Sequence, residues 1–196
     1  MTAVRRAGPG RVVLELDGRL WRIVPDEVVL RLGFAAGDEL DRGTLRRLRA
    51  ELRRVEAFAA AGRSLSRRDL SKARLRERLR RAGVAPAEKE RTLARLERMG
   101  LVDDHRLARA RAATLAERGW GDAAIAARLE EDGIDASTGR AVIDELAPER
   151  ERALALAGGE CDRRKAGSLL IRRGFSPDSI EAAVGMLDEG LPTQLG

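Results

Sequence analysis

The sequence has very little of what catalytic and metal centres are built from. Among its 196 residues there is one histidine, His105, and one cysteine, Cys161, and the two stand far apart without a recognisable catalytic motif. One histidine cannot form a two-histidine metal site, and one cysteine cannot form an internal disulfide. Nothing in the sequence places the two side chains together as a nucleophile pair. We therefore expect no enzymatic activity, no metal and no cofactor.

Aromatic residues and long apolar runs are scarce as well. Aromatic residues make up 3% of the chain and tyrosine is absent, which argues against binding single strands by stacking bases on exposed rings. We expect Trp21 and Trp120 to be packing residues. No Gly-Lys-Ser/Thr phosphate-binding sequence occurs. No segment has the apolar run of a membrane-spanning helix and the N-terminus lacks the apolar core of a signal peptide, so a cytoplasmic protein is expected.

The first part of the chain predicts a small β-structure followed by helices. Residues 11–16 and 19–24 are rich in valine, leucine and isoleucine, and Asp17-Gly18 between them suits a type I′ hairpin turn. A lone hairpin is marginal in water, so it should pack on the helices that follow. The next expected helices are residues 26–32, ended by Gly33, and residues 44–61, capped by Asp41 or Thr44 and closed by Gly62.

One short pattern occurs three times in the rest of the chain. It consists of leucine, three residues, glycine and an apolar residue, and a second apolar pair stands 10 and 13 residues after each glycine. The copies are Leu79, Gly83, Val84, Leu93 and Leu96; Leu129, Gly133, Ile134, Ile143 and Leu146; and Leu170, Gly174, Phe175, Val184 and Leu187. The intervals between the glycines, about 50 and 40 residues, are typical of helical repeats, which usually bind something large.

Within each copy we expect a helix that ends at the glycine, a turn, and a second helix that buries the apolar pair. Pro86 and Pro177 stand near the start of that second helix. A further helix, such as residues 104–118, would complete a three-helix unit. The expected fold class is mainly α, with tandem three-helix repeats in an elongated array after a small N-terminal β-hairpin. The expected domains are residues 1–62, followed by repeats at residues 63–118, 119–160 and 161–196.

The charges are distributed unevenly along the chain. The formal net charge is +6, and all but three of the 38 basic residues are arginine. Residues 63–81 contain nine basic and two acidic residues, whereas residues 122–151 contain nine acidic residues and three arginines. Arginine forms bidentate contacts with phosphate and carboxylate, so two basic clusters around an acidic middle suit a partner made of protein and nucleic acid. A GC-rich coding sequence and solvated helix faces are the alternative explanations.

The basic clusters supply the candidate contact residues. In the helix expected around residues 72–81, Leu75 and Leu79 mark the buried side, and Arg74, Arg78 and Arg81 share another side. Such a row would suit a phosphate backbone, with binding that weakens as salt rises. The full set of candidate contact residues is Arg67, Arg68, Lys72, Arg74, Arg78, Arg81, Arg163, Arg164, Lys165, Arg172 and Arg173. Asp103 and Asp104 could bind a hard cation, but acids before a helix more often cap it.

Several segments carry a resemblance to a known family. They are residues 68–84, with Leu75, Leu79 and Gly83; residues 96–108, with Gly100-Leu-Val-Asp103-Asp104; residues 118–134, with Gly119-Trp120-Gly121; and the N-terminal Asp17-Gly18, Leu32-Gly33-Phe34 and Gly37-Asp-Glu-Leu40. Together they resemble the RecX family of bacterial regulators of the RecA recombinase, over nearly the whole chain. The family commonly has phenylalanine where Leu107 stands, and its basic helices often mix lysine with arginine.

The resemblance implies a non-enzymatic, monomeric modulator built from tandem three-helix repeats. Proteins of this family bind the RecA–DNA filament, lie in its helical groove and suppress ATP hydrolysis, coprotease activity and strand exchange in recombination, DNA repair and the SOS response. An array of linked modules can contact several protomers and gain avidity without one strong site. One alternative is a protein that binds single- or double-stranded DNA directly through helix-turn-helix-like units. A third reading is a scaffold whose arginines are only solvated.

Overall fold

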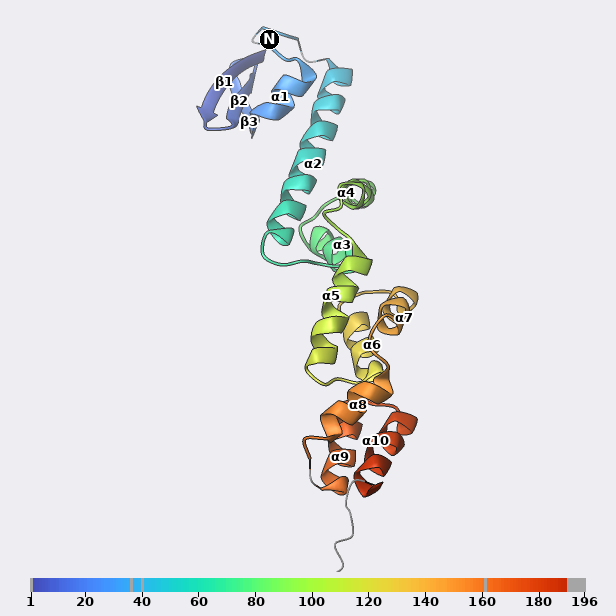
Figure 1. Ribbon diagram of the computed structural model, residues 1–196. Coiled ribbons are helices and arrows are strands. Elements are labelled where there is room, and N and C mark those ends of the chain that lie inside the picture. The colour runs from blue at the N-terminus through green and yellow to red at the C-terminus, as the bar shows by residue number, and fades with distance from the viewer. Residues whose placement is uncertain (1, 36, 40, 161, 190–196) are drawn as a thin grey trace, which may run out of the picture. The chain divides into compact units, whose positions relative to one another are not determined.

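The structure, a computed structural model, describes residues 2–35, 37–39, 41–160 and 162–189 (Figure 1). Leu40, Cys161 and the side chain of Leu187, which enter the sequence analysis, lie outside the described residues. The chain divides into two compact units. The first comprises the residues up to Arg67 together with Arg76–Arg95, and the second comprises Arg68–Leu75 together with the residues from Leu96 onward.

The first unit begins with a three-stranded antiparallel sheet in the order β1 (Thr2–Gly8), β2 (Arg11–Leu16) and β3 (Arg19–Pro25). The predicted hairpin is confirmed, since Asp17 and Gly18 both have positive φ, 51° and 75°, as a type I′ turn requires. Strand β1 is an addition to it. The sequence signal for this strand is weak because its only large apolar residue is Val4, although Pro9-Gly10 marks the turn that follows.

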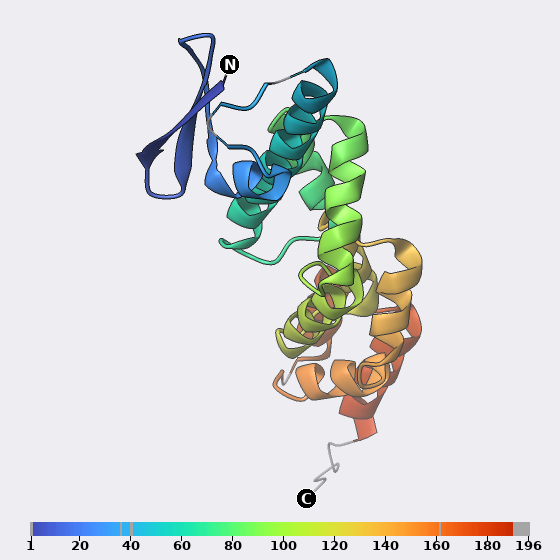
Figure 2. The ribbon, with the colours of Figure 1, turned by 90° about the horizontal axis from the view of Figure 1, so that it is seen from above.

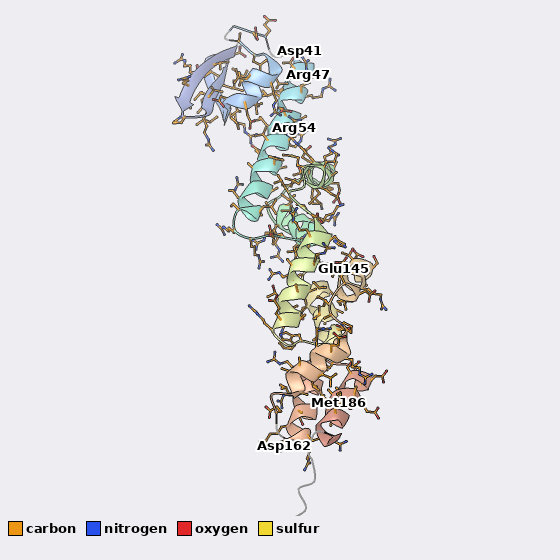
Figure 3. All side chains as sticks on the ribbon, in the orientation of Figure 1. Asp41, Arg47, Arg54, Glu145, Asp162 and Met186 are labelled. Atoms are coloured by element: carbon orange, nitrogen blue, oxygen red, sulfur yellow. The ribbon has the colours of Figure 1, made fainter. Side chains whose placement is uncertain are left out.

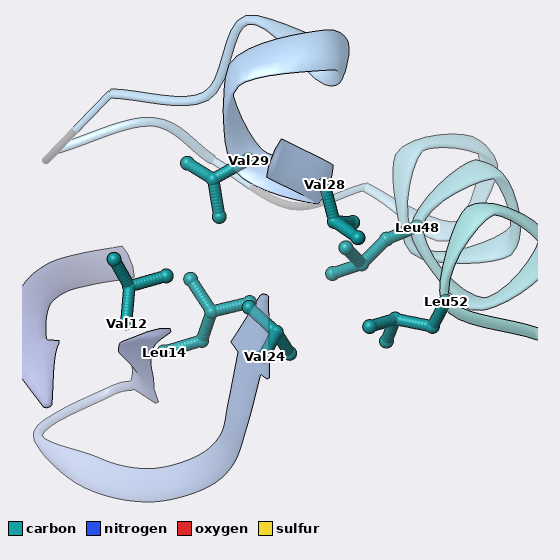
Figure 4. Packing of buried hydrophobic residues seen from close by; sticks show 7 residues of the cluster. All are labelled: Val12, Leu14, Val24, Val28, Val29, Leu48 and Leu52. Carbon is teal, nitrogen blue, oxygen red and sulfur yellow. The ribbon is translucent and has the colours of Figure 1, made fainter. Parts of the chain in front are cut away.

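One face of the sheet packs on two helices, α1 (Asp26–Leu32) and α2 (Arg42–Leu65) (Figures 2 and 4). The side chains of this cluster are Val12, Leu14 and Val24 from the sheet, Val28 and Val29 from α1, and Leu48 and Leu52 from α2. Trp21 packs against it, half-buried. Fully burying one such aliphatic side chain contributes about 1.5–3 kcal/mol. The small sheet therefore depends on these helices for its stability.

The ends of helices α1 and α2 agree only in part with the predicted ends: Gly33 and Asp41 are confirmed and Gly62 is not. Helix α1 ends at Gly33, which takes the left-handed conformation with φ 67°. The N-cap of α2 is Asp41, whose Oδ1 accepts a hydrogen bond of 2.6 Å from the backbone N–H of Thr44. The prediction that Gly62 closes α2 is wrong. A glycine ends a helix when its φ is positive, whereas Gly62 stays helical and its carbonyl accepts from the N–H of Ser66 at 2.9 Å.

The remaining helices carry the repeated pattern. They are α3 (Lys72–Arg81), α4 (Pro86–Arg98), α5 (Asp104–Glu117), α6 (Asp122–Glu131), α7 (Ala136–Asp144), α8 (Glu149–Ala157), α9 (Arg163–Arg172) and α10 (Pro177–Glu189). Gly83, Gly133 and Gly174 end α3, α6 and α9 with φ of 75°, 78° and 76°, as predicted. The leucine four residues before each of them, at 79, 129 and 170, exposes at most 1% of its surface.

The second apolar pair is buried less uniformly than the pattern predicts. Leu93 and Leu96 are buried, but Ile143, Leu146 and Val184 are only half-buried, and Leu146 lies beyond the end of α7. The most deeply buried side chains of α7 and α10 are Val142 and Ala183, each one residue before Ile143 or Val184. The face that a helix buries on two neighbours is wider than a single stripe, so the burial spreads to a position that the spacing rule does not include.

A pair of alanines marks the helix that completes each three-helix group. Ala57 and Ala61 in α2, Ala108 and Ala112 in α5, and Ala153 and Ala157 in α8 are all buried. Small side chains at a helix contact allow the helices to lie close together. Helix α5 packs on α6 and α7, and α8 packs on α9 and α10. In these two groups the completing helix precedes its pair, whereas the expected boundaries group residues 104–118 with the pair before them.

Candidate functional site

The arginines predicted to form a row on α3 make different contacts. The guanidinium of Arg74 donates to the carbonyl of Glu131, in the last turn of α6. Arg81 donates through Nε to Oε1 of Glu77 at 2.8 Å, whereas Arg78 has no polar partner among the described residues. Hydrogen bonds from Arg80 and Arg81 lower the pKa of Glu77 to about 2. Of the three predicted side chains, Arg78 is therefore the one without a polar partner in the described part of the chain.

The basic end of α3 also has an electrostatic explanation. Arg78, Arg80 and Arg81 lie in its last turn. A cation there interacts favourably with the negative end of the helix dipole, by about 0.3–1 kcal/mol at an exposed position. The charge density at this end of α3 is thus accounted for in part by the stability of the helix itself.

Two of the predicted residues, Arg68 and Arg74, come together at the start of α3. They line a polar hollow of about 210 Å3 together with Arg111 of α5. Arg111 belongs to none of the charge clusters in the sequence, and its Nε lies 3.7 Å from a carboxylate oxygen of Asp132. The other predicted residues nearby differ: Lys72 donates through Nζ to Glu97 at 2.7 Å, and Arg67 is exposed in the segment before α3.

The helix dipole, which favours the cations at the end of α3, does not favour the basic cluster in the first turn of α9. Arg163, Arg164 and Lys165 are exposed and occupy the positive end of the helix dipole, where a cation is unfavourable. The N-cap residue is Asp162 (Figure 3), whose Oδ1 accepts from the backbone N–H of Arg164 at 2.8 Å. The side chains of Arg164 and Lys165 have no partner among the described residues. Helix stability therefore does not explain this cluster, which makes it the strongest candidate for an anionic partner.

The two arginines at the other end of α9 differ from each other. Arg172 is exposed and makes no polar contact within the described part of the chain. Arg173 donates to the carbonyl of Arg118 at 3.0 Å, and its guanidinium lies 4.8 Å from the centroid of the Trp120 ring. Arg173 thus joins the third helix group to the second, and Trp120 packs as predicted.

The junction that joins successive helix groups has no local signal in the sequence. The first turn of α6 meets the end of α9, where the N–H of Gly121 donates to the carbonyl of Arg173 at 2.9 Å. The first turn of α3 meets the end of α6 in the same way, where the hydroxyl of Ser71 donates to the carbonyl of Asp132 at 2.5 Å. Both acceptors immediately precede the left-handed glycine. The Leu-x-x-x-Gly pattern therefore marks a contact between repeats as well as a helix end.

A carboxylate from the first turn of α5 or α8 completes each junction. Asp104 of α5 accepts from the N–H of Lys72 at 2.8 Å, and Glu149 of α8 accepts from the N–H of Asp122 at 2.7 Å. Asp103, by contrast, caps its own helix by accepting from the N–H of Arg106. No group of acidic, histidine or cysteine side chains in the described ranges could hold a metal ion. The two acids at positions 103 and 104 thus have structural roles.

Burial and hydrogen bonding shift these carboxylates in opposite directions. Burial raises the pKa of Asp104, and it raises that of Asp122 despite the ion pair of Asp122 with Arg152. Burial alone would also raise the pKa of Glu149, but donors from Ser176, Asp122 and Ser179 together outweigh it and lower that pKa. Glu149 is therefore the hydrogen-bonded centre of the second junction.

The comparisons with known proteins give one family name. A regulatory protein RecX of Halorhodospira halophila is 36% identical over 141 residues, which cover 66% of this chain and 87% of that protein. One from Thermus thermophilus is 38% identical over 125 residues, covering 61% and 84%. No model of a known protein family matches the sequence.

Solved structures of the same name share the fold. A crystal structure of a regulatory protein RecX superposes with a TM-score of 0.73 at 22% identity and covers 93% of this chain and 98% of its own. That of RecX from Lactobacillus salivarius gives 0.65 at 20% identity, covering 70% and 97%. None of the helices in the described ranges is long and apolar enough to cross a membrane.

Proposed function

Because the chain belongs to the RecX family of regulatory proteins, we propose that it regulates the RecA recombinase by binding the RecA–DNA filament. The bound protein lowers the ATPase, coprotease and strand-exchange activities of RecA in recombination, DNA repair and the SOS response. In this proposal the protein acts in the cytoplasm, as a monomer and without catalysis. The observation that supports it most directly is the exposed basic cluster in the first turn of α9, which the helix does not need.

The contact residues divide by what each side chain already touches. The proposed contacts with DNA phosphate or with acidic side chains of the filament are the cations without a polar partner in the described part of the chain: Arg67, Arg68, Arg78, Arg164, Lys165 and Arg172. Arg163 lies in the same turn as Arg164 and adds to the local positive potential. Lys72, Arg74, Arg81 and Arg173 already make polar contacts within the protein, so they are less available to a partner.

The test is inhibition of RecA by a variant whose exposed charge is reversed. At stoichiometric amounts the wild-type protein should lower the DNA-dependent ATPase and strand-exchange activities of RecA. Arg164→Glu with Lys165→Glu should weaken this inhibition at least tenfold and leave helicity unchanged. The matched control is Arg140→Glu with Arg150→Glu, which makes the same change in net charge at two other exposed cations. No effect of the wild-type protein on RecA would overturn the proposal, and equal effects of the two double variants would remove the α9 cluster from it.

A stand-alone DNA-binding protein is the second candidate, and the junctions restrict it. In a helix-turn-helix protein the first turn of one helix reads the groove. The first turns of α3 and α6 are covered by Gly133 and Gly174 of the next helix groups, which leaves the basic first turn of α9. Fluorescence anisotropy on bare duplex, and on the same DNA coated with RecA, separates the two functions. Much tighter binding to the coated DNA favours the filament regulator, and tight sequence-selective binding to bare duplex favours the alternative.

A further inference from the structure

Of the three equivalent glycine turns, the one at Gly83 is open. A Cβ added at Gly133 would lie 3.0 Å from Ser71 and Ala73, and one added at Gly174 would lie 2.8 Å from the Cβ of Ala124. At Gly83 no described atom lies within 4 Å of that position. A hollow of about 240 Å3 lies beside this turn, in the first unit, lined by the turn itself, by residues of α2 and by Glu88 of α4. The end of α3 therefore has the shape of a junction but no occupant.

The occupied turns define what fits such a place. At Gly133 and at Gly174 the occupant is the first turn of a helix, and a small residue of that turn lies against the glycine. The occupant also donates a hydrogen bond to the carbonyl of the residue before the glycine, from Ser71 at Gly133 and from Gly121 at Gly174. The positive end of one helix dipole thereby meets the negative end of another, which is favourable. By the same geometry, the place beside Gly83 fits the first turn of a helix.

The charge at the open turn differs from that at the other two. In α2, α5 and α8, the positions four residues before the first buried alanine are equivalent: they are Arg53, Asp104 and Glu149. Asp104 and Glu149 accept a backbone N–H of the occupant. Arg53 cannot accept one. Arg53 and Arg63 both line the hollow, and their exposed side chains have no polar partner among the described residues. Two acids line it as well, but Glu56 pairs with Arg22 at 2.8 Å and Glu88 pairs with Arg91 at 3.6 Å. An occupant must therefore bring the carboxylate itself.

We propose that the hollow beside Gly83 docks the first turn of a helix of the partner protein, one that begins with a small residue and an acidic residue. The proposal rests on the proposed function, in which that partner is a RecA protomer of the filament. The acidic side chain pairs with Arg53 and Arg63, and the first free N–H groups of the helix face the end of α3. Acidic residues are favoured in the first turn of helices, so this occupant combines common features.

A second copy of this chain is a poor occupant. The first turn of α9 corresponds to the first turns of α3 and α6, and it carries Arg163, Arg164 and Lys165, which are exposed. These would face Arg53 and Arg63, so that five cations would meet without a compensating acid from the occupant except Asp162, which already caps α9. Like charges in contact disfavour such a complex. The two unpaired arginines of the hollow thus favour a different, acidic helix.

The test measures binding to filaments assembled from RecA, DNA and a non-hydrolysable ATP analogue. Arg53→Glu with Arg63→Glu should weaken binding at least tenfold. The control Arg42→Glu with Arg49→Glu, at two exposed positions of α2 outside the hollow, should change it less than twofold. Circular dichroism and the unfolding midpoint verify that both variants fold. If the wild-type chain binds and the two double variants bind alike, the docking proposal is overturned while the proposed function stands. If the wild-type chain does not bind, both are overturned.

A second measurement leaves the charges unchanged. A photoreactive residue placed at Ala85, which is exposed and lines the hollow, should cross-link to a RecA peptide that contains the acidic first turn of a helix. The same residue at Ala141, an exposed position in α7, serves as the control and should not yield that peptide. A cross-link from position 85 to DNA, to another copy of this chain or to a RecA segment without a helix start would overturn the proposal.

Discussion

Arg74 and Arg173 carry the charge of a contact residue but act within the fold. Each guanidinium donates to a carbonyl near the end of a helix in a neighbouring repeat, on Glu131 and Arg118 respectively. The carbonyls at a helix C-terminus lack intrahelical donors and carry partial negative charge, so arginine suits them. The density of arginine in the sequence therefore overstates the surface available to a partner.

Glycine at position 121 is required by the close approach of two backbones. A Cβ there would overlap the carbonyl group of Gly174, so Gly121→Ala should lower the free energy of unfolding by about 1–3 kcal/mol through overpacking. Urea unfolding followed by circular dichroism measures this. The control is Gly185→Ala in α10, where a Cβ would meet no atom within 4 Å. That variant should be about 0.5–1 kcal/mol more stable, because alanine favours the helix. A neutral Gly121→Ala would contradict the junction.

The charge of Asp104 opposes stability at neutral pH. Burial raises the pKa of this carboxyl although the N–H and ammonium of Lys72 act to lower it. A raised pKa means that the stabilising contribution is fully present below the unfolded-state pKa of about 3.9 and is lost as the pH rises through the folded-state value. Asp104→Asn keeps an acceptor for the N–H of Lys72 and carries no charge. It should therefore raise the free energy of unfolding at pH 7.

Measurements at low pH test whether the charge of Asp104 is the cause of this difference in stability. The advantage of Asp104→Asn should vanish at a pH of about 3, below the ordinary aspartate pKa, where the wild-type carboxyl is itself protonated. Asp103→Asn is the matched control, because Asp103 is an exposed N-cap and asparagine caps helices as well as aspartate does. Destabilisation of Asp104→Asn at pH 7 would mean that attraction to Lys72 outweighs burial.

At the scale of the element, one leucine holds the first helix of each repeat. Leu79, Leu129 and Leu170 expose at most 1% of their surface, so replacing any of them with alanine should lower the free energy of unfolding by about 2–5 kcal/mol. Leu30, which is 77% exposed in α1, is the control and should change it by less than about 0.5 kcal/mol. Thermal and urea unfolding measure both. A loss below 1 kcal/mol at Leu129 would show that its site collapses around the smaller side chain.

Local signals predict the ends of these elements well, because each is decided by a few neighbouring residues. Gly33, Gly83 and Gly174 end helices since left-handed backbone is available to glycine without a Cβ penalty. Gly62 breaks the rule because the residues after it continue the helix. The junctions escape such signals entirely, since Ser71 and Asp132 meet only once the helices have packed. The same holds for the candidate site. The sequence predicts a cluster of arginines, but only the packed structure shows that Arg81 is paired with Glu77 and that Arg78 has no polar partner in the described part of the chain.

At the scale of the whole molecule, the ion pairs reduce a large basic surplus to a small set of available cations. The chain carries 38 basic and 32 acidic residues. Many arginines of the first cluster are matched within it or nearby, as Arg80 and Arg81 are by Glu77. The second cluster has no acidic residue between its members, and Arg164, Lys165 and Arg172 have no partner in the described part of the chain. The net charge of this protein therefore does not give the number of cations that are available to a partner.

The salt dependence of binding distinguishes the effect of net charge from that of the cations that contact the partner. If the α9 cations contact DNA phosphates of the filament, each of Arg164→Gln, Lys165→Gln and Arg172→Gln should reduce the steepness of the plot of log affinity against log salt by about 0.7–0.9 for the phosphate contact it removes. Arg81→Gln also removes one positive charge, but the arginine lies on Glu77 at 2.8 Å, so this variant should leave the steepness unchanged. Titrations on filaments between low and moderate salt provide the slopes. Equal reductions in all four variants would mean that the filament responds to net charge, and the ion pair at Glu77 would then not shield Arg81.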